Sequence, residues 1–103
     1  MNVERWNTEV DGELTEDRLR QKLASRGYVV TRYVYPPGAY FPEHEHGVDK
    51  IDAVLSGRFR MTMGGETAIL EAGDCMLVPR RTMHSAEVVG DEPVVSLDAV
   101  KMA

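Results

Sequence analysis

The histidines are the residues whose type and spacing point most directly to chemistry. The chain contains three of them. His44 and His46 are two residues apart, and side chains at positions i and i+2 of an extended strand face the same side. Their imidazoles would lie about 6–7 Å apart along such a strand and could converge on one metal ion. His84 follows a strand end marked by Pro79, and a neighbouring antiparallel strand could bring it to the same ion.

An H-x-H pair alone is weak support for a metal site. His44 and His46 stand beside Glu43 and Glu45, and two exposed surface histidines in a polar strand explain the pair equally well. The glycine and proline residues around the histidines favour the metal site.

The first histidine pair lies in a stretch that resembles the first motif of the cupin family, G-x5-H-x-H-x3,4-E-x6-G. Five residues separate Gly38 from His44, and three residues separate His46 from Lys50. Six more residues separate Lys50 from Gly57.

His84 lies in a stretch that resembles the second cupin motif, G-x5-P-x-G-x2-H-x3-N. Gly73, Pro79 and His84 occupy motif positions, with Arg81 and Val88 at the remaining two. The resemblance covers residues 38–88, about half the chain. It implies a small single-domain β-barrel that is open at one end and holds a metal ion near its floor.

Three residues depart from the family pattern. Arg81 replaces a turn glycine and Val88 replaces an asparagine, which affects the turn and the strand edge. Lys50 stands where the family places a metal-binding glutamate. A protonated lysine has no lone pair and repels a cation, so the usual set of three histidines and one glutamate is not intact.

Different arrangements can fill the position that the glutamate leaves. Asp52 lies on the same strand face as Lys50 and could reach the ion, and Asp49 could do so if the loop shifts by one residue. In the arrangement that we favour, the three histidines alone hold the ion and leave positions open, as in the three-histidine iron cupins, such as cysteine dioxygenase and diketone dioxygenases. The third possibility is an internal Lys50–Asp52 ion pair with no physiological metal.

Further residues are candidates for the wall of the barrel cavity. Methionine fills irregular gaps. Arg80 and Arg81 near His84 could attract an acidic substrate, although we favour the interpretation that they are solvated turn residues. The candidate pocket residues are Tyr40, Lys50, Phe59, Met61, Met76 and Arg81.

The sequence pattern predicts a helix followed by short strands. Thr15 can cap a helix over residues 16–26, with Leu19 and Leu23 on one face and Gly27 at its end. After Gly27 the hydrophobic period changes to two. The predicted strands cover residues 28–35, 58–63, 67–70, 75–78, 84–89 and 93–100, with a Gly64–Gly65 hairpin.

Together with the resemblance, this pattern predicts an all-β fold, an antiparallel, jelly-roll-like cupin β-barrel with a short N-terminal helix. We expect residues 1–27 to form a helical segment packed on a barrel domain of residues 28–103. Leu19 and Leu23 should face the barrel, and Trp6 should cover an apolar patch nearby. The strand over residues 28–35 is apolar on both faces, which predicts a homodimer.

Composition excludes several classes of protein. The chain has 103 residues and a net charge of −5, with no basic block, which argues against nucleic-acid binding. No apolar run is as long as a membrane helix, which needs about 18 residues. The first residues do not resemble a signal peptide. The single cysteine, Cys75, excludes an internal disulfide framework. We therefore expect a cytoplasmic protein.

Two functional hypotheses follow. The first is a metal-dependent enzyme acting on a small molecule, with dioxygenase chemistry if the ion is iron and isomerase or lyase chemistry if it is zinc, manganese or nickel. The second is a non-catalytic cupin that binds a small ligand or a metal ion as a sensor. A degraded site with a structural role fits the missing glutamate but not the three retained histidines.

Overall fold

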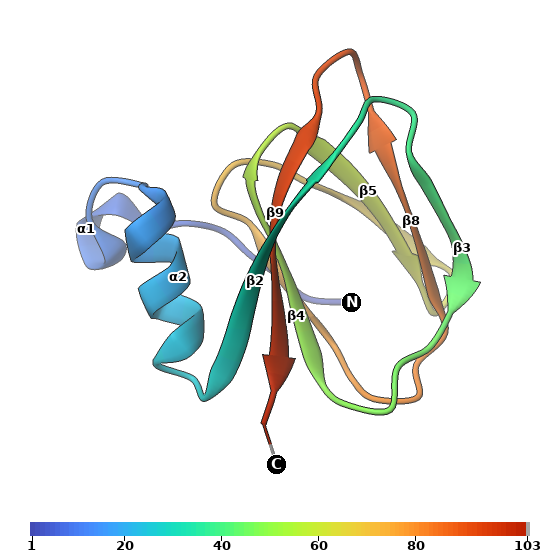
Figure 1. The fold of residues 1–103 in the computed structure, drawn as a ribbon, viewed down its shortest axis with the longest axis horizontal. Coiled ribbons are helices and arrows are strands. Elements are labelled where there is room, and N and C mark those ends of the chain that lie inside the picture. The colour runs from blue at the N-terminus through green and yellow to red at the C-terminus, as the bar shows by residue number, and fades with distance from the viewer. Residues whose placement is uncertain (103) are drawn as a thin grey trace.

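Two antiparallel sheets face each other in the computed structural model of the chain, which describes residues 1–102 (Figure 1). Residue 103, the expected end of the barrel domain, lies outside the described residues. The helices are α1 (Thr8–Asp11) and α2 (Glu16–Ala24). The strands are β1 (Val3–Glu4), β2 (Tyr28–Tyr35), β3 (Tyr40–His44), β4 (Lys50–Ser56), β5 (Arg58–Met63), β6 (Glu66–Leu70), β7 (Cys75–Val78), β8 (His84–Val89) and β9 (Val94–Lys101).

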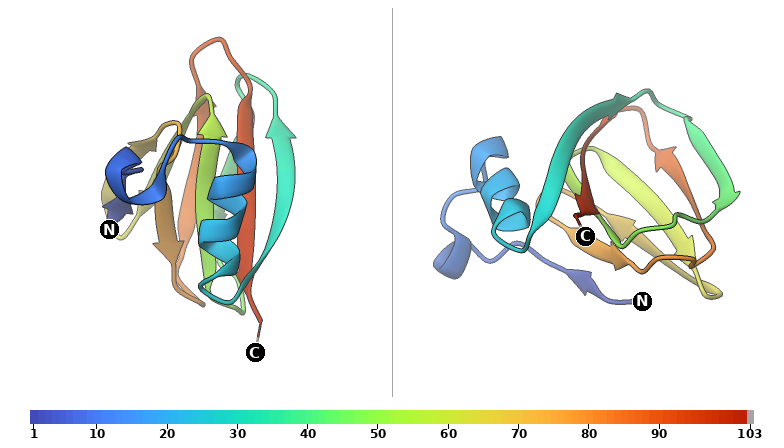
Figure 2. Two further views of the ribbon diagram at one scale, coloured as in Figure 1. Left: turned by 90° about the vertical axis from the view of Figure 1, so that its left-hand side faces the viewer. Right: turned by 60° about the horizontal axis from the view of Figure 1, so that its bottom comes forward.

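One sheet has the strand order β1-β7-β4-β9-β2 and the other has the order β3-β8-β5-β6. The expected all-β antiparallel architecture with a short N-terminal helix is confirmed. Within residues 1–102, however, the hydrogen-bonded strands form two separate sheets and do not close into one continuous barrel. The right-hand view of Figure 2 shows the two sheets opposite each other. The edge strand β2 of one sheet and the edge strand β3 of the other both lie at the top of this view.

The helix α2 forms where the sequence predicts it and ends slightly earlier, at Ala24. The Thr15 side chain accepts a hydrogen bond from the Arg18 backbone N–H at 3.1 Å, which satisfies one of the free donors of the first turn. Leu19 and Leu23 are fully buried. The left-hand view of Figure 2 shows α2 lying along the strands of the five-stranded sheet.

The outer face of this sheet carries an apolar cluster beneath α2. Its buried members are Leu19, Leu23, Ile51, Ala53, Cys75, Leu97 and Ala99. Trp6 is partly buried against this cluster, as expected, and its indole N–H donates a hydrogen bond to the Gly12 carbonyl at 2.8 Å.

Strand β4 is central in the five-stranded sheet and is buried on both faces. Its residues 50–54 are all buried, and their side chains alternate between the two faces of the sheet. Ile51 and Ala53 belong to the outer cluster, whereas Lys50 and Asp52 line a cavity between the sheets. The inner cluster between the sheets consists of Val54, Phe59, Met61, Leu70, Met76, Val78, Ala86, Val88 and Val94.

Steric crowding explains why two of the motif positions, Gly57 and Gly73, are glycine. Gly57 and Gly73 have positive φ angles of 85° and 88°, which favour glycine. A Cβ atom at Gly57 would lie 2.3 Å from the Pro93 carbonyl oxygen, and one at Gly73 would lie 2.5 Å from Trp6 Cβ. These glycines allow the turns before β5 and β7 to pack closely.

Among residues 1–102, no helix has both the length and the apolar character needed to cross a membrane.

Candidate metal centre

The three histidines meet at one end of the cavity, although they are far apart in sequence. His44 is the last residue of β3 and His84 is the first residue of β8, and the two are direct partners in the antiparallel pairing. His46 lies in the loop before β4. Their candidate ligand nitrogens all lie within 4.8 Å of one another, and the ring centroids of His44 and His84 are 4.3 Å apart.

A β-bulge decides which side chains of β3 accompany His44. The register between β3 and β8 shifts between Phe41 and His44. Regular alternation from His44 would place Tyr40 inside and Phe41 outside. The shift reverses this order, so Phe41 lines the cavity and Tyr40 is 62% exposed.

Backbone carbonyls orient two of the imidazoles. His44 Nδ1 lies 2.7 Å from the Pro42 carbonyl oxygen, and His84 Nδ1 lies 2.8 Å from the Thr82 carbonyl oxygen. A carbonyl only accepts, so each Nδ1 carries the proton and donates it. The lone pair of each ring is therefore on Nε2, which is the arrangement that metal-binding histidines commonly have.

His46 has a polar atom without a partner. Its Nε2 is buried and makes no hydrogen bond within the described part of the chain. Its loop is held in place by the Arg81 backbone N–H, which donates to the His46 carbonyl at 2.7 Å. A buried polar atom without a partner costs free energy, and an ion beside it would remove that cost.

The donor set fits a divalent ion. Burial lowers the pKa of His46 and of His84 below the ordinary value, which favours the neutral form that a ligand requires. Two metal–nitrogen bonds of about 2.1 Å can join nitrogens about 3–4 Å apart, so small side-chain rotations would close the set. His44, His46 and His84 are the residues that could hold the ion.

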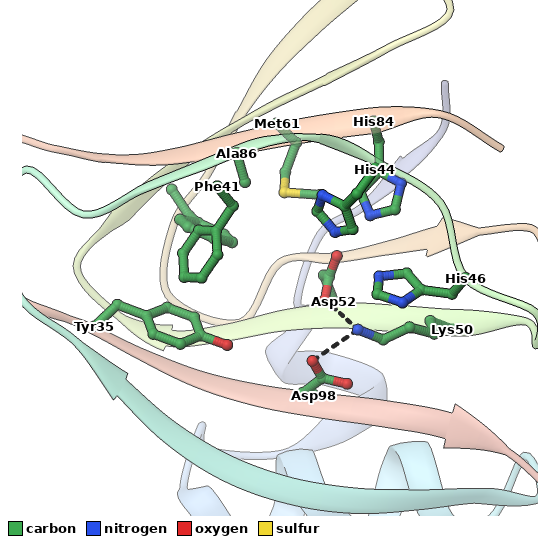
Figure 3. A pocket seen from close by; sticks show the side chains of 11 residues that line it. Tyr35, Phe41, His44, His46, Lys50, Asp52, Met61, His84, Ala86 and Asp98 are labelled. Atoms are coloured by element: carbon green, nitrogen blue, oxygen red, sulfur yellow. Dashed lines mark hydrogen bonds and ion pairs between the residues drawn. The ribbon is translucent and has the colours of Figure 1, made fainter.

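The histidines open onto a cavity of about 180 Å³ between the two sheets. Tyr35, Phe41, Met61 and Ala86 lie on its walls away from His46 and Lys50 (Figure 3). Within the described part of the chain, the lining consists of Tyr35, Phe41, His44, His46, Lys50, Asp52, Phe59, Met61, His84, Ala86 and Asp98.

A charged group occupies the wall formed by β4 and β9. The Lys50 Nζ donates a hydrogen bond to Asp98 Oδ2 at 2.8 Å and lies 4.0 Å from Asp52 Oδ1. Burial raises the pKa of Asp52 to about 6 despite the nearby Lys50 charge. The main partner of Lys50 is thus Asp98, which the sequence analysis did not identify, and Asp52 is a weaker one.

Asp52 and Asp49 are not part of the histidine cluster. Among the described residues, that cluster contains only the three imidazoles. Asp52 lies on the same sheet face as Lys50, as the spacing predicts, but next to the ammonium. The Asp49 carboxylate accepts a hydrogen bond from the Arg80 backbone N–H at 2.8 Å, within the loops.

The structure places Lys50, Phe59 and Met61 on the cavity wall and corrects the expectation for three other residues. Tyr40 points away because of the bulge. Met76 is almost fully buried in the inner cluster, outside the cavity lining. The Arg81 side chain is exposed on the turn before β8, where the backbone has a positive φ of 58°.

Sequence reasoning missed four lining residues: Tyr35, Phe41, Ala86 and Asp98. Alternation along residues 84–89 carried a usable signal for Ala86, because it lies two residues after His84 on the same face. Asp98 gave no such signal, since its role depends on the pairing of Asp52 with Asp98 across β4 and β9.

Comparisons with known proteins agree on the fold family. The sequence profile of the cupin domain matches residues 31–100. A solved cupin protein from Bacteroides fragilis superposes with a TM-score of 0.64 at 30% identity, covering 82% of this chain and 74% of that one.

Two curated enzymes are similar over most of this chain. One is a gentisate 1,2-dioxygenase from a Ralstonia species, 28% identical over 85 residues, which are 82% of this chain and 24% of the enzyme. The other is a nitrosourea synthase from Streptomyces achromogenes subsp. streptozoticus, 31% identical over 72 residues, 69% of this chain and 15% of the enzyme. The chain thus spans a quarter or less of the length of these relatives.

Proposed function

The chain belongs to the cupin family, and on this premise we propose that it binds a divalent metal ion through His44, His46 and His84 and acts as a metal-dependent enzyme on a small molecule. The observation that carries the proposal is the orientation of the imidazoles. Backbone carbonyls hold two of them with Nε2 free to bind, and the third has a buried Nε2 that makes no hydrogen bond within residues 1–102. Such a set is costly without an ion and complete with one.

The chemistry belongs to the ion, and the residues of the chain supply its surroundings. When bound, a divalent ion with three histidine ligands keeps open positions for a small ligand and acts as a Lewis acid, or in the case of iron allows dioxygen chemistry. Phe41, Phe59 and Met61 give the cavity an apolar wall, which restricts water and orients the apolar part of a substrate. Similarity to the gentisate dioxygenase favours the oxidative form of this proposal.

Metal analysis of protein purified without a histidine tag tests the first half of the proposal. We expect about one ion per chain. His84→Ala should lose most of it, because two ligands hold a divalent ion poorly. Asp52→Asn should retain it, since Asp52 lies beside Lys50. Glu45→Gln is a matched control, because it removes an exposed carboxylate between two ligands. Loss of the ion in Asp52→Asn to the extent seen in His84→Ala would make Asp52 a fourth ligand.

Oxygen uptake tests the second half. Iron-loaded protein should consume oxygen with a small aromatic acid such as gentisate, and His84→Ala should not. The alternative is a non-catalytic metal-binding or ligand-binding cupin, which the exchange of the family glutamate for Lys50 favours. In that case a ligand would raise the melting temperature of the loaded protein with no turnover.

We also propose that the chain forms a homodimer through β2. This strand lies at the edge of its sheet, and Val29 and Val34 are 51% and 53% exposed on its opposite faces. The N-terminal segment covers only the first part of the strand, where Tyr28 and Val30 pack against the cluster beneath α2 and Arg32 pairs with Glu16. Sedimentation should show a dimer at micromolar concentration, and Val34→Glu should shift it toward a monomer. Thr67→Glu, an exposed change on β6, should not. A monomer of the unchanged protein would refute the proposal.

A further inference from the structure

The cavity has a second polar wall that faces the histidines. Lys50 and Asp52 come from β4 and Asp98 from β9, whereas His44 and His84 come from β3 and β8 of the other sheet (Figure 3). All five side chains line the same cavity. A ligand in this space would therefore lie between the imidazoles and the charged group.

Lys50 has hydrogen-bonding capacity to spare. Its ammonium carries three donors, and among residues 1–102 it makes one hydrogen bond, to Asp98. The nearest Asp52 oxygen is 4.0 Å away, which is beyond hydrogen-bonding distance. Lys50 is only 8% exposed, so bulk water has little access to its remaining donors and a ligand in the cavity is well placed to accept from them.

The charges around the cavity do not balance once an ion is bound. Three neutral histidines leave a divalent ion with both of its positive charges, and Lys50 adds one more. Asp52 and Asp98 together offset two of these, so a single positive charge remains within the pocket lining. Uncompensated charge in a partly buried site is unfavourable. A monoanion would neutralise it, whereas an amine would add to it.

We propose that the cavity binds a small organic monoanion, such as a monocarboxylate, with its charged end between the histidine-bound ion and the Lys50 ammonium. This inference rests on the proposed three-histidine centre. Lys50, at the position of the family glutamate, thereby acts on the ligand instead of the metal. A charge-assisted hydrogen bond from a buried ammonium to a carboxylate is among the stronger polar contacts in proteins.

The apolar wall limits the rest of the ligand. Phe41, Phe59 and Met61 are the large apolar side chains of the lining. Phe41 lies away from Lys50, whereas the Tyr35 hydroxyl points toward Asp98 (Figure 3). The volume of about 180 Å³ is similar to the roughly 150 Å³ of an engineered protein cavity that holds one benzene molecule. The ligand class is therefore a monoanion of about the size of one ring.

Benzoate and benzamide provide a matched pair of probes, because they differ mainly in charge. Protein loaded with Zn²⁺, which has no redox chemistry, would be titrated with each by calorimetry. We expect benzoate to bind at least about tenfold more tightly than benzamide. Lys50→Met should weaken benzoate binding by about tenfold or more and leave benzamide binding nearly unchanged.

Two further variants separate the ammonium contact from net charge and from folding. Arg80→Gln removes one positive charge from an exposed turn, and benzoate binding should stay as in the unchanged protein. Lys50→Met/Asp98→Asn removes the Lys50–Asp98 pair as a whole, so the Asp98 carboxylate is not left without its closest partner and the cavity keeps its net charge. This double variant should lose benzoate affinity as much as Lys50→Met does.

The results distinguish a failure of this inference from a failure of the proposed function. Zinc stoichiometry is measured first, and a chain that takes up no zinc refutes both. If zinc binds at about one ion per chain but benzoate binds Lys50→Met as well as the unchanged protein, only the anion inference is wrong. It is also wrong if benzoate is not preferred over benzamide, or if the double variant binds benzoate normally.

Discussion

Strands β4 and β9 present apolar residues on the outer face of the five-stranded sheet and charged residues on the inner face. Outside, Ile51 and Leu97 pack against α2 with almost no exposure. Inside, Lys50, Asp52 and Asp98 line a cavity. The outer face gains free energy from apolar burial, whereas the inner face carries the cost of desolvating charges. The comparison separates the part of the molecule that stabilises the fold from the part that is available for binding.

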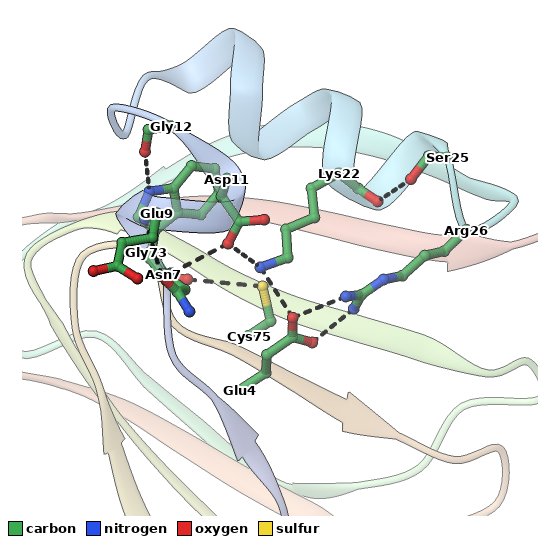
Figure 4. Close-up of polar contacts among 11 residues, drawn as sticks. Glu4, Asn7, Glu9, Asp11, Gly12, Lys22, Ser25, Arg26, Gly73 and Cys75 are labelled. Atoms are coloured by element: carbon green, nitrogen blue, oxygen red, sulfur yellow. Dashed lines mark hydrogen bonds and ion pairs between the residues drawn. The ribbon is translucent and has the colours of Figure 1, made fainter.

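The ion pairs on the two sides of the sheet differ in how closely each carboxylate is paired and in how deeply it is buried. On the outer side, Arg26 donates two hydrogen bonds of 2.8 Å to Glu4, and Lys22 lies 2.9 Å from Glu4 and from Asp11 (Figure 4). The Arg26 hydrogen bond lowers the pKa of Glu4 to about 2, while burial raises the pKa of Asp52 to about 6. A solvated carboxylate with close partners is stabilised as the anion, and a buried one with a distant partner is not.

The largest expected effect on stability comes from the outer face. Leu23→Ala removes a fully buried side chain and should lower the free energy of unfolding by about 2–5 kcal/mol, as measured by urea denaturation. Gln21→Ala, an exposed change on the same helix, should alter it by less than about 0.5 kcal/mol. Zinc stoichiometry should not change in either variant, and a loss of zinc in folded Leu23→Ala would break the separation of the two faces.

On the inner face, replacing Asp52 should raise the free energy of unfolding, whereas replacing Leu23 on the outer face lowers it. The pKa of Asp52 is raised on folding, so its contribution to stability is full below about pH 4 and is lost as the pH rises through about 6. Asp52→Asn should therefore stabilise the metal-free protein at pH 7, by up to about 3 kcal/mol. His46 and His84, whose pKa values are lowered, act in the opposite direction and destabilise the fold as the pH falls. Both histidines are present in Asp52→Asn and in the unchanged protein. The difference in unfolding free energy between these two proteins, measured by urea denaturation across this pH range, therefore reports on Asp52.

Asp98→Asn serves as the control for this prediction. It removes the negative charge 2.8 Å from the Lys50 ammonium and should lower the free energy of unfolding at pH 7 by about 1–3 kcal/mol, because a hydrogen bond between two charged groups is replaced by one to a neutral amide. Equal effects of the two asparagine variants would mean that Lys50 does not discriminate between its carboxylate neighbours, and the inner charged group would need another description.

The smallest expected effect is that of the outer ion-pair network. Glu4→Gln should lower the free energy of unfolding by less than about 1 kcal/mol, because the Glu4 side chain is 43% exposed and solvent screens its partners. Its pKa is lowered on folding, so this contribution is present above about pH 4.5 and is lost as the pH falls toward 2. Added salt should reduce the difference between Glu4→Gln and the unchanged protein. An effect above about 2 kcal/mol would place this network among the main determinants of stability.

Local sequence was sufficient for elements whose pattern is local. The cap at Thr15 and the spacing of Leu19 and Leu23 predicted α2, and alternation together with the Gly64–Gly65 pair predicted the β5–β6 hairpin. Strand β4 was not among the predicted strand ranges, although Lys50 and Asp52 were expected on one strand face and the structure places both on the inner face of the sheet. The bulge in β3 was not predicted either, which is why Tyr40 and not Phe41 was expected in the cavity.

The spacing of the histidines and motif glycines carries the resemblance to the cupin family, and that resemblance implied a fold in which three imidazoles can converge. These positions depend on short-range geometry. Strand periodicity places His44 and His46 on one side in an extended segment, and turns without room for a Cβ atom require glycine. The tertiary structure alone decided that Lys50 pairs with Asp98, 48 positions away in the sequence. Such a contact depends on the pairing of β4 with β9, and the register between strands distant in sequence is a property of the whole fold.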